Sequence, residues 1–176
     1  AVLASQIAAI EVARVGVQNR VVHDTASLVL AQWLHDEGLL TVPAEDAVSM
    51  GAHAAFFPHG IGHIIGLDVH DMEDLGDRAG YAPGRARSTR FGLGYLRLDR
   101  DLEAGMAVTI EPGFYQVPAL LEDPARTAAA GDRLVRSRLA DFEDVRGIRI
   151  EDDILITAGG SEVLTEGAPK TVEAVQ

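Results

Sequence analysis

The sequence predicts an α+β fold in a single domain, and three observations indicate it. Apolar residues recur at helical spacing through residues 1–54, whereas short stretches of alternating apolar and polar residues follow them. A length of 176 residues suits one domain that buries most of its apolar surface. No internal repeat and no linker that would divide the chain is evident.

Three helices are expected in the N-terminal part. The first spans about residues 2–13, where apolar side chains recur at helical spacing before a glycine. The second begins at a cap formed by Asp24 and Thr25 and ends at Gly38. The third begins at Pro43, a residue suited to a first helical turn. We expect these helices to serve packing rather than chemistry.

Strands are expected in the second half of the chain. Residues 106–111 alternate in polarity, and residues 147–157 do so again. The second alternation places Arg149 and Glu151 on one face, about 6.5–7 Å apart along the strand. A glycine-rich turn then leads into residues 162–164.

Two irregular, charged segments separate the strands. They span roughly residues 72–100 and 116–146, and glycine and proline residues interrupt the first of them. Segments of this composition and length are typical of surface insertions or lids.

Composition excludes several classes of function. The formal charge is −12, and no block of lysine and arginine could follow a phosphate backbone, which disfavours a nucleic-acid partner. The absence of cysteine excludes a disulfide scaffold and a thiolate metal site, and it fits a reducing compartment. No apolar run approaches the length of a membrane span.

The segment PHGIGHIIGLDVHD, residues 58–71, contains three histidines. His59 and His63 are four residues apart, but the glycine and proline residues around them make a helix unfavourable. His63 and His70 are seven apart, which places them on opposite faces of a regular strand. We therefore expect the three to do different jobs, although a single histidine in such a turn is more often structural.

Three further polar residues have a structural and a functional interpretation. Glu111, at the end of a strand, is by itself more often a solvated side chain, and Arg149 with Glu151 is more often a surface ion pair. Together with imidazoles and without thiolates, however, two strand-borne carboxylates are typical of a mixed nitrogen and oxygen metal site. Such sites suit Mn, Co, Fe or Zn.

Three segments in succession resemble a known family. Residues 58–71, then LEAGMAVTIEPGFY at 102–115, then residues 146–173 resemble the C-terminal motifs of the pita-bread metallopeptidases, in the branch of prolidase and aminopeptidase P. The resemblance implies the C-terminal portion of a pita-bread fold, in which helices back a curved, mostly antiparallel sheet.

The resemblance also implies roles for residues of the metal site. His63 matches the imidazole ligand, Glu111 a carboxylate ligand that also shuttles a proton, and Glu151 the carboxylate that bridges two ions. The implied cofactors are two divalent ions, expected to be Mn²⁺, with Co²⁺ or Zn²⁺ as alternatives.

Three more residues match positions around the substrate. His59 and His70 match histidines that line the substrate pocket and stabilise the tetrahedral intermediate. Arg149 matches an arginine beside the bridging carboxylate, at the edge of the substrate site.

The implied reaction is hydrolysis of Xaa-Pro peptide bonds by a hydroxide held between the two ions. A prolidase, which cleaves Xaa-Pro dipeptides, is favoured, and an aminopeptidase P is the alternative. A creatinase-like protein without metal and an inactive binding module of the same fold are the rival classes.

Two aspartate ligands of the family's site have no match in this sequence. No acidic pair in residues 1–54 has the required setting, and Asp24 has the context of a helix cap. We therefore expect residues 1–176 to form the C-terminal part of one catalytic domain. Its partner would be the N-terminal part of the same enzyme, and this chain alone would be inactive. The complete enzyme is expected to be a cytoplasmic homodimer that acts on proline-containing peptides, without nucleic-acid or membrane partners.

Overall fold

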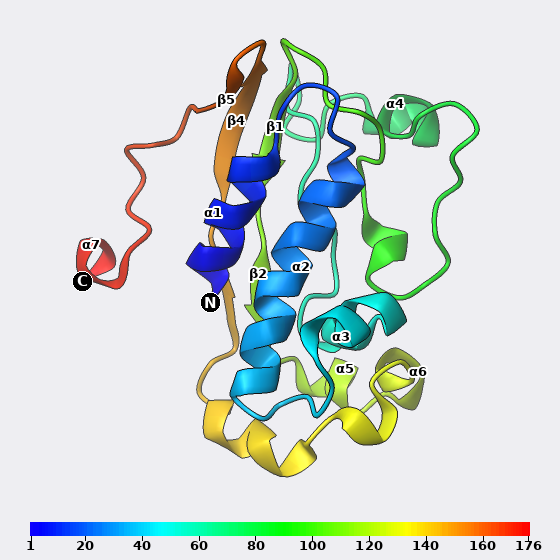
Figure 1. The fold of residues 1–176 in the computed structure, drawn as a ribbon, viewed down its shortest axis with the longest axis vertical. Helices are drawn as coiled ribbons and strands as arrows, with labels where there is room; N and C mark the ends of the chain where they lie inside the picture. Colours follow the sequence, from blue (N-terminus) through cyan, green and yellow to red (C-terminus); the bar gives the residue numbers. More distant parts are fainter.

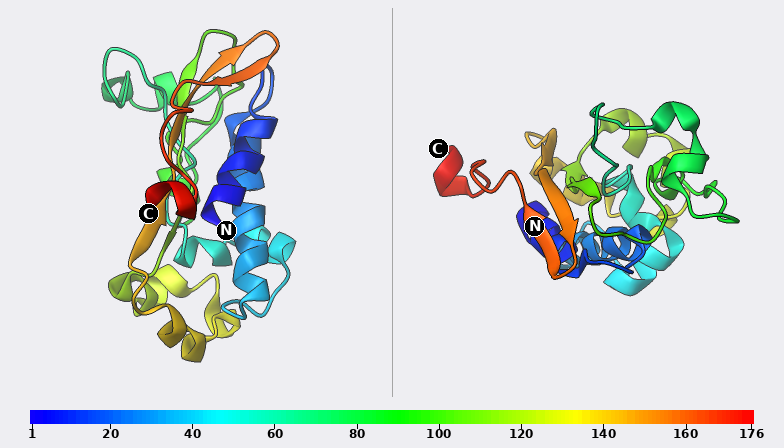
Figure 2. Two further views of the ribbon diagram at one scale, coloured as in Figure 1. Left: turned by 90° about the vertical axis from the view of Figure 1, so that its left-hand side faces the viewer. Right: turned by 90° about the horizontal axis from the view of Figure 1, so that it is seen from above.

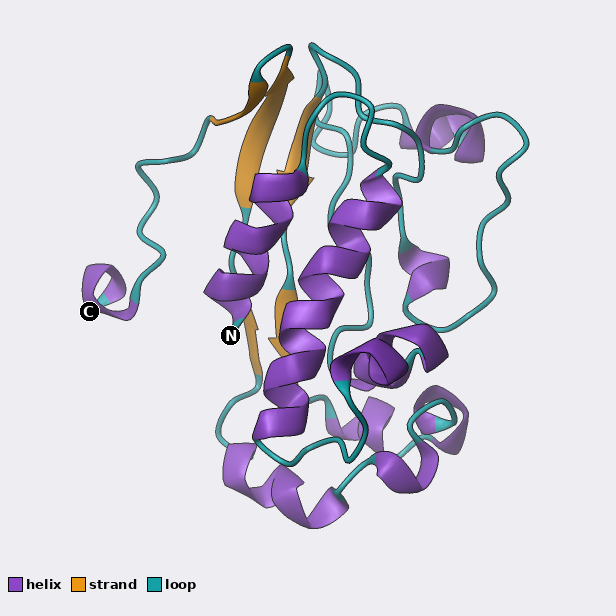
Figure 3. Cartoon of the chain, viewed as in Figure 1, coloured by secondary structure: helices purple, strands orange, loops and turns teal.

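The computed structural model describes residues 1–176 and contains helices and antiparallel strands (Figures 1 and 3). The three longest helices are α1 (Val2–Val12), α2 (Asn19–Asp36) and α3 (Ala44–Met50). The strands are β1 (Ala107–Ile110), β2 (Gly113–Tyr115), β3 (Gly147–Arg149), β4 (Asp152–Thr157) and β5 (Gly160–Val163). Three short helices lie in the connections, α4 (Asp77–Gly80), α5 (Pro118–Leu121) and α6 (Pro124–Thr127), and α7 (Val172–Val175) follows the last strand.

All three strand pairings are antiparallel, as the resemblance implied. One sheet has the order β1-β4-β5, and β2 pairs with β3 in a second sheet. Helices α1 and α2 lie side by side and cover one face of the strands (Figure 1, and Figure 2, left). The free edge of β1 is occupied by residues 61–65, which form a bridge between Ile64 and Val108.

The main core lies between the helices and the strands. It combines apolar side chains of α2, such as Leu30 and Leu34, with Ile110 of β1 and Ile154 of β4, all at most 2% exposed. Burial of these side chains supplies the main stabilisation, because apolar burial is the dominant favourable term in folding. The helices therefore hold the back of the sheet, and the other side is available for a site.

The predicted start of the second helix is wrong. Helix α2 begins at Asn19, and Asp24 lies inside it rather than at its cap. Tertiary contacts explain the longer helix, because the buried Asn19 side chain donates a hydrogen bond to the carbonyl of Leu98 and its main-chain N–H donates to Arg100. The first and third helices lie where the sequence predicted them.

The single strand predicted over residues 147–157 is two strands. Strand β3 pairs with β2 and β4 pairs with β1, and Ile150 and Glu151 lie between them. The partner strand is interrupted at the same level by Pro112, which has no N–H to donate. The ladder therefore breaks at this point, although the chain continues in the same direction.

The two irregular segments are not simple surface insertions. Residues 72–100 bury Leu96 and Leu98, and residues 116–146 bury Leu121 and Leu134. Each segment thus contributes to the core while the rest of it lies at the surface. No helix combines the length and the apolar character that crossing a membrane requires.

Candidate metal centre and substrate cavity

The histidine segment lies against β1 because Gly62 has no side chain. A Cβ atom at this position would lie 1.9 Å from the carbonyl oxygen of Thr109. Main-chain bonds fix the register: Thr109 donates to the carbonyl of His63 at 2.9 Å, and Glu111 donates to Ile61 at 2.7 Å. The segment is extended rather than helical, as its glycine content predicted.

Glu111 and Glu151 face each other at the break in the strands. On one side of the break Ile110 pairs with Asp152, and on the other Gly113 pairs with Arg149. Because the register is the same on both sides, Glu111 lies opposite Glu151, where side chains of antiparallel strands are closest neighbours. The shared register therefore places both carboxylates side by side, and the main-chain N–H of Ile150 donates to the carbonyl of Pro112 at 3.4 Å beside them.

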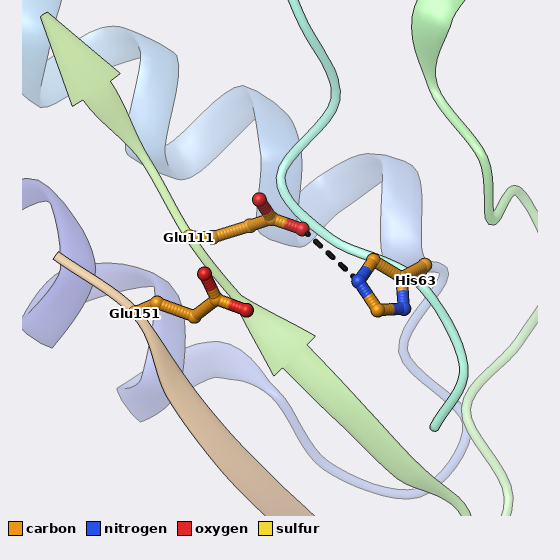
Figure 4. A group of neighbouring side chains, drawn as sticks. All are labelled: His63, Glu111 and Glu151. Carbon is orange, nitrogen blue, oxygen red and sulfur yellow. Dashed lines mark ion pairs between the residues drawn. The ribbon is translucent and has the colours of Figure 1, made fainter. Parts of the chain in front are cut away.

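His63 completes a cluster with the two carboxylates. One ligand atom from each of His63, Glu111 and Glu151 lies within 4.8 Å of the other two (Figure 4). His63 and Glu111 are buried, whereas Glu151 is exposed. The three side chains come from the segment beside β1, the end of β1 and the residue before β4, and they point toward one another.

The hydrogen bonds of His63 select its tautomer. Nδ1 lies 3.0 Å from the carbonyl oxygen of Ile64, which can only accept, so Nδ1 carries the proton. The lone pair of Nε2 is then directed at Glu111, whose Oε1 lies 3.5 Å away. Orientation of a metal-binding imidazole through its other nitrogen is a common feature of metal sites.

Thr109 links two members of the cluster. Its buried hydroxyl accepts a hydrogen bond from the main-chain N–H of His63 at 3.0 Å and donates one to Oε1 of Glu111 at 3.1 Å. Thr109 therefore fixes the positions of both the imidazole segment and the carboxylate.

Arg149 forms its ion pair with Glu111 rather than with Glu151. Its Nη1 lies 3.0 Å from Oε2 of Glu111. Glu151 is exposed as a residue, but partial desolvation of its carboxyl raises the pKa of that group, and the neighbouring negative charge of Glu111 raises it further. A cluster of one imidazole and two neighbouring carboxylates, without sulfur, fits a hard or borderline divalent cation.

A second network links His59, Tyr115 and Arg149. Nε of Arg149 donates to the hydroxyl oxygen of Tyr115 at 2.6 Å, and that hydroxyl lies 3.0 Å from Nε2 of His59. Nδ1 of His59 lies 2.7 Å from the carbonyl oxygen of Gly60 and donates to it, so Nε2 is the acceptor for the tyrosine proton. Burial lowers the pKa of His59 and raises the pKa of Tyr115, which keeps both groups neutral.

His70 does not lie on the opposite face from His63. Their ring centroids are 4.3 Å apart, and the rings meet edge to face. The expectation assumed a regular strand, but residues 66–70 bend and return the chain to the cluster. Nδ1 of His70 lies 3.8 Å from Oε2 of Glu73, and its side chain is 47% exposed.

A cavity of about 610 Å³ lies beside the cluster. Five of the predicted site residues line it, namely His59, His63, His70, Glu111 and Arg149. The volume is within the range typical of pockets for small ligands. Glu151 lines a second, more apolar groove instead, and Arg149 lines both.

The sequence analysis missed Thr109 and Tyr115. Thr109 shares a strand face with Glu111, two residues later, and this parity was the available signal. Tyr115 follows Glu111 by four residues and reaches the site because the pairing of β2 with β3 brings Arg149 within hydrogen-bond distance of its hydroxyl. That contact depends on strand pairing, so no local pattern predicts it.

Antiparallel strands that bring one imidazole and two carboxylates together beside a polar cavity define a candidate metal-dependent enzyme. The model of metallopeptidase family M24 matches residues 1–158, and this chain belongs to that family.

Two relatives within this family are named as Xaa-Pro dipeptidases. The chain is 44% identical over 165 residues to a Xaa-Pro dipeptidase of Xanthomonas campestris pv. campestris (strain B100). It is 42% identical over 173 residues to a Xaa-Pro dipeptidase of Stenotrophomonas maltophilia (strain K279a). These alignments cover 94% of this chain but only 36% and 38% of the relatives. The chain thus spans little more than a third of their length.

Two solved structures with the same fold are aminopeptidases P. Proline aminopeptidase P II from Yersinia pestis superposes with a TM-score of 0.68 at 31% identity, over 99% of this chain and 32% of that chain. A zinc-substituted aminopeptidase P from E. coli, in complex with product, superposes with a TM-score of 0.67 at 30% identity, over 99% of this chain and 31% of that chain. These similarities confirm the expected pita-bread fold and its C-terminal portion.

Proposed function

We propose that the complete protein containing this chain hydrolyses Xaa-Pro peptide bonds with a divalent-metal centre, and that it prefers dipeptides. The observation that carries the proposal is the cluster of His63, Glu111 and Glu151, whose ligand atoms lie within 4.8 Å of one another. Similarity to Xaa-Pro dipeptidases at 44% identity supports the substrate class.

In this proposal His63, Glu111 and Glu151 hold the metal, His63 through Nε2. Divalent ions at such a site supply Lewis acidity and lower the pKa of water to near neutrality. We propose two Mn²⁺ ions, and the donor set also suits Co²⁺ or Zn²⁺. Metal analysis of the complete protein, purified without added metal, tests occupancy and identity.

Glu111 carries the proton in the proposed reaction. Oε2 is held by the guanidinium of Arg149 at 3.0 Å, so Oε1, which accepts the Thr109 hydroxyl, is the oxygen that takes a proton from water. The proton then passes to the leaving proline nitrogen, which has no hydrogen of its own before cleavage.

The other cavity residues position the substrate. In this arrangement Nε2 of His59 accepts from Tyr115, so His59 orients the tyrosine rather than donating to substrate. His70 is half-exposed beside His63 and is free to donate a hydrogen bond to the carbonyl oxygen of the scissile bond. Loss of one such donor reduces turnover by roughly 10²–10³-fold.

Three substitutions in the complete enzyme test these roles. Glu111→Gln should keep the cavity and lose most turnover, and His63→Ala should lose both metal and turnover. His70→Ala should keep metal and lose rate. Glu103→Gln, which changes an exposed glutamate, is the matched control. Retention of metal by His63→Ala with its loss in His70→Ala would reverse the assignment.

We further propose that residues 1–176 form the C-terminal part of the catalytic domain and that residues outside this chain supply the remaining ligands. Coverage of 36% of the relatives and the presence of only three clustered ligands support this. The 176-residue chain alone should not hydrolyse Xaa-Pro dipeptides, and mixing it with the upstream part should restore Mn²⁺ binding and activity. Robust hydrolysis by the isolated chain would contradict the ligand count.

An aminopeptidase P activity is the second candidate, because the similar solved structures named above are aminopeptidases P. Rates on Xaa-Pro and on Xaa-Pro-Yaa peptides separate the two activities. Absence of bound metal and of both activities in the complete protein would favour an inactive binding module. The cytoplasmic homodimer implied by the resemblance stays a prediction, which sedimentation and localisation experiments can test.

A further inference from the structure

Glu151 is the least supported of the three clustered ligands. The carboxylate of Glu111 is bound by both Thr109 and Arg149. The imidazole of His63 is oriented through Nδ1. The exposed carboxylate of Glu151, by contrast, has no hydrogen-bond or ion-pair partner among the side chains of the cluster. Its position therefore depends on the main chain that carries it, which lies at the break in the strands.

The C-terminal tail, residues 164–176, supports this main chain along one edge of β4. Strand β5 pairs with β4 only over residues 154–157, so the first residues of β4 have no partner from β5 on that edge. The tail continues in its place. The N–H of Leu164 donates to the carbonyl of Asp153 at 2.8 Å, and the N–H of Asp153 donates to Oγ1 of Thr165 at 3.0 Å. Figure 2 (left) shows the tail, in red, running from β5 to α7 in front of the strands.

Lys170 attaches the tail to a buried carboxylate. Its Nζ lies 2.7 Å from Oδ1 and 2.9 Å from Oδ2 of Asp152, whose side chain is 2% exposed. The hydroxyl of Thr165 donates to the same Oδ1 at 2.6 Å. A buried carboxylate is costly without such partners. Lys170 is the only lysine of this chain, so no neighbouring amine can replace it.

Asp152 connects this attachment to the metal cluster. It follows Glu151 directly, and its pairing partner Ile110 directly precedes Glu111. Successive side chains of an extended chain point to opposite faces, so Asp152 is held on one face while Glu151 projects from the other. A fixed Asp152 therefore fixes both the position of Glu151 along the strand and the direction in which its carboxylate points.

We propose that Lys170 is a positioning residue of the metal centre, which acts through Asp152 on the main chain that carries Glu151. The inference rests on the proposed function, because Glu151 is a metal ligand there. Lys170 belongs neither to the cluster nor to the lining of the cavity of about 610 Å³, so it acts without touching metal or substrate.

Mn²⁺ titration of the complete enzyme, freed of metal, tests this role. Lys170→Met should weaken Mn²⁺ binding by at least about 10-fold, the lower end of the loss that is typical when the support of a metal ligand is removed. Lys170→Arg keeps a cation that can bind both carboxylate oxygens and should restore most of the affinity. Thr165→Val should weaken Mn²⁺ binding in the same direction.

A double variant separates positioning from stability. Lys170→Met alone leaves a buried carboxylate unpaired and lowers Tm. Replacement of a buried ion pair by apolar side chains of similar volume is often neutral for stability. Asp152→Leu combined with Lys170→Met should therefore recover much of the Tm. Its Mn²⁺ affinity should stay low, because the tail is still detached from the strand.

Leu40→Ala is the matched control for lost stability. Leu40 is 1% exposed, forms a bridge with Leu134 and lines neither the cavity nor the second groove. Truncation of such a buried side chain should lower Tm to a similar extent while Mn²⁺ affinity stays at the wild-type level.

Wild-type Mn²⁺ affinity in folded Lys170→Met would overturn the inference. Recovery of both Tm and Mn²⁺ affinity in the double variant would also overturn it, because a purely structural role makes the two recover together. If Lys170→Met does not fold, the double variant decides alone. Wild-type enzyme that binds Mn²⁺ but cleaves neither Xaa-Pro nor Xaa-Pro-Yaa peptides would instead refute the proposed function, while the titrations would still test the role of Lys170.

Discussion

Substitution of Thr109 by valine is the sharpest test of how the cluster is held together. Valine has nearly the same shape, so the change removes a hydroxyl without opening a cavity. Thr109 is 1% exposed, and its hydroxyl bonds to both the main-chain N–H of His63 and Oε1 of Glu111. The substitution leaves one buried donor and one carboxylate oxygen without their partner.

The structure sets the expected size of the effect. A hydrogen bond to a charged group contributes about 1.5–3 kcal/mol, and an orphaned buried N–H costs about 1–3 kcal/mol. The sum is about 2.5–6 kcal/mol, and we expect the lower end because Arg149 still binds Glu111. For a domain of about 150–250 residues that corresponds to a fall in Tm of about 5–10 °C, and the fall is smaller in a longer complete enzyme. Loss of such an orienting contact also weakens metal binding by about 10–100-fold.

Thermal unfolding and Mn²⁺ titration of the complete enzyme measure the two effects. Thr109→Ser keeps the hydroxyl and should keep metal affinity, while it loses some stability through its missing methyl group. Thr25→Val is the control, because that exposed hydroxyl only bonds back to Val21 within α2. Wild-type metal affinity in Thr109→Val would refute the argument that this hydroxyl positions the ligands.

Three further predictions concern stability. Burial lowers the pKa of His23 to about 3 and the pKa of His53 to about 4. In the unfolded chain a histidine titrates near 6.5. The unfolded state therefore binds more protons than the folded state below about pH 6.5, so the contribution of these histidines to the free energy of unfolding is full above that pH. As the pH decreases toward about 4 the protein loses stability, and the loss reaches about 4 kcal/mol at pH 5. The urea midpoints of unfolding at about pH 7.5 and about pH 5 measure this loss of stability. His23→Gln should roughly halve the difference between them, and a midpoint that does not depend on pH would contradict the prediction. Gly62→Ala should cost at least about 3 kcal/mol, because its Cβ would meet main-chain oxygen of β1, while Gly159→Ala, with open space around it, should be tolerated. Lys170→Met should cost about 3–5 kcal/mol in thermal unfolding, since it leaves a carboxylate that is 2% exposed without its cation; an unchanged Tm would show that the pair is dispensable.

Local patterns predicted the elements that depend on local physics. The helical spacing in residues 2–13 and the proline at position 43 gave two helices close to their observed bounds. The start of α2 was wrong because its first turn depends on bonds from Asn19 to residues 98 and 100. Contacts over such a separation have no local signature.

Some residues of the candidate site were predicted from the sequence, and others were missed because their positions depend on contacts between distant residues. His63, Glu111 and Glu151 were predicted from motif order, and the structure brings them together. Tyr115 was missed because its position depends on the pairing of β2 with β3. The prediction that His63 and His70 lie on opposite faces was wrong, because side chains alternate between faces only in a regular strand and the chain bends between these two residues.

The break in the strands explains why the carboxylates meet at this place. A regular ladder would continue through Glu111 and Glu151, because the pairings of Ile110 with Asp152 and of Gly113 with Arg149 have one register. Pro112 removes a donor from that ladder without changing the register. The two glutamates thus remain cross-strand neighbours, close enough for a shared cation, and the carbonyl of Pro112 still accepts a bond from Ile150 although Pro112 donates none. Like charges at such a position are unfavourable unless a cation lies between them. The sequence Glu-Pro-Gly therefore combines two requirements in three residues: it ends one strand pair, and it retains the alignment that a metal centre needs.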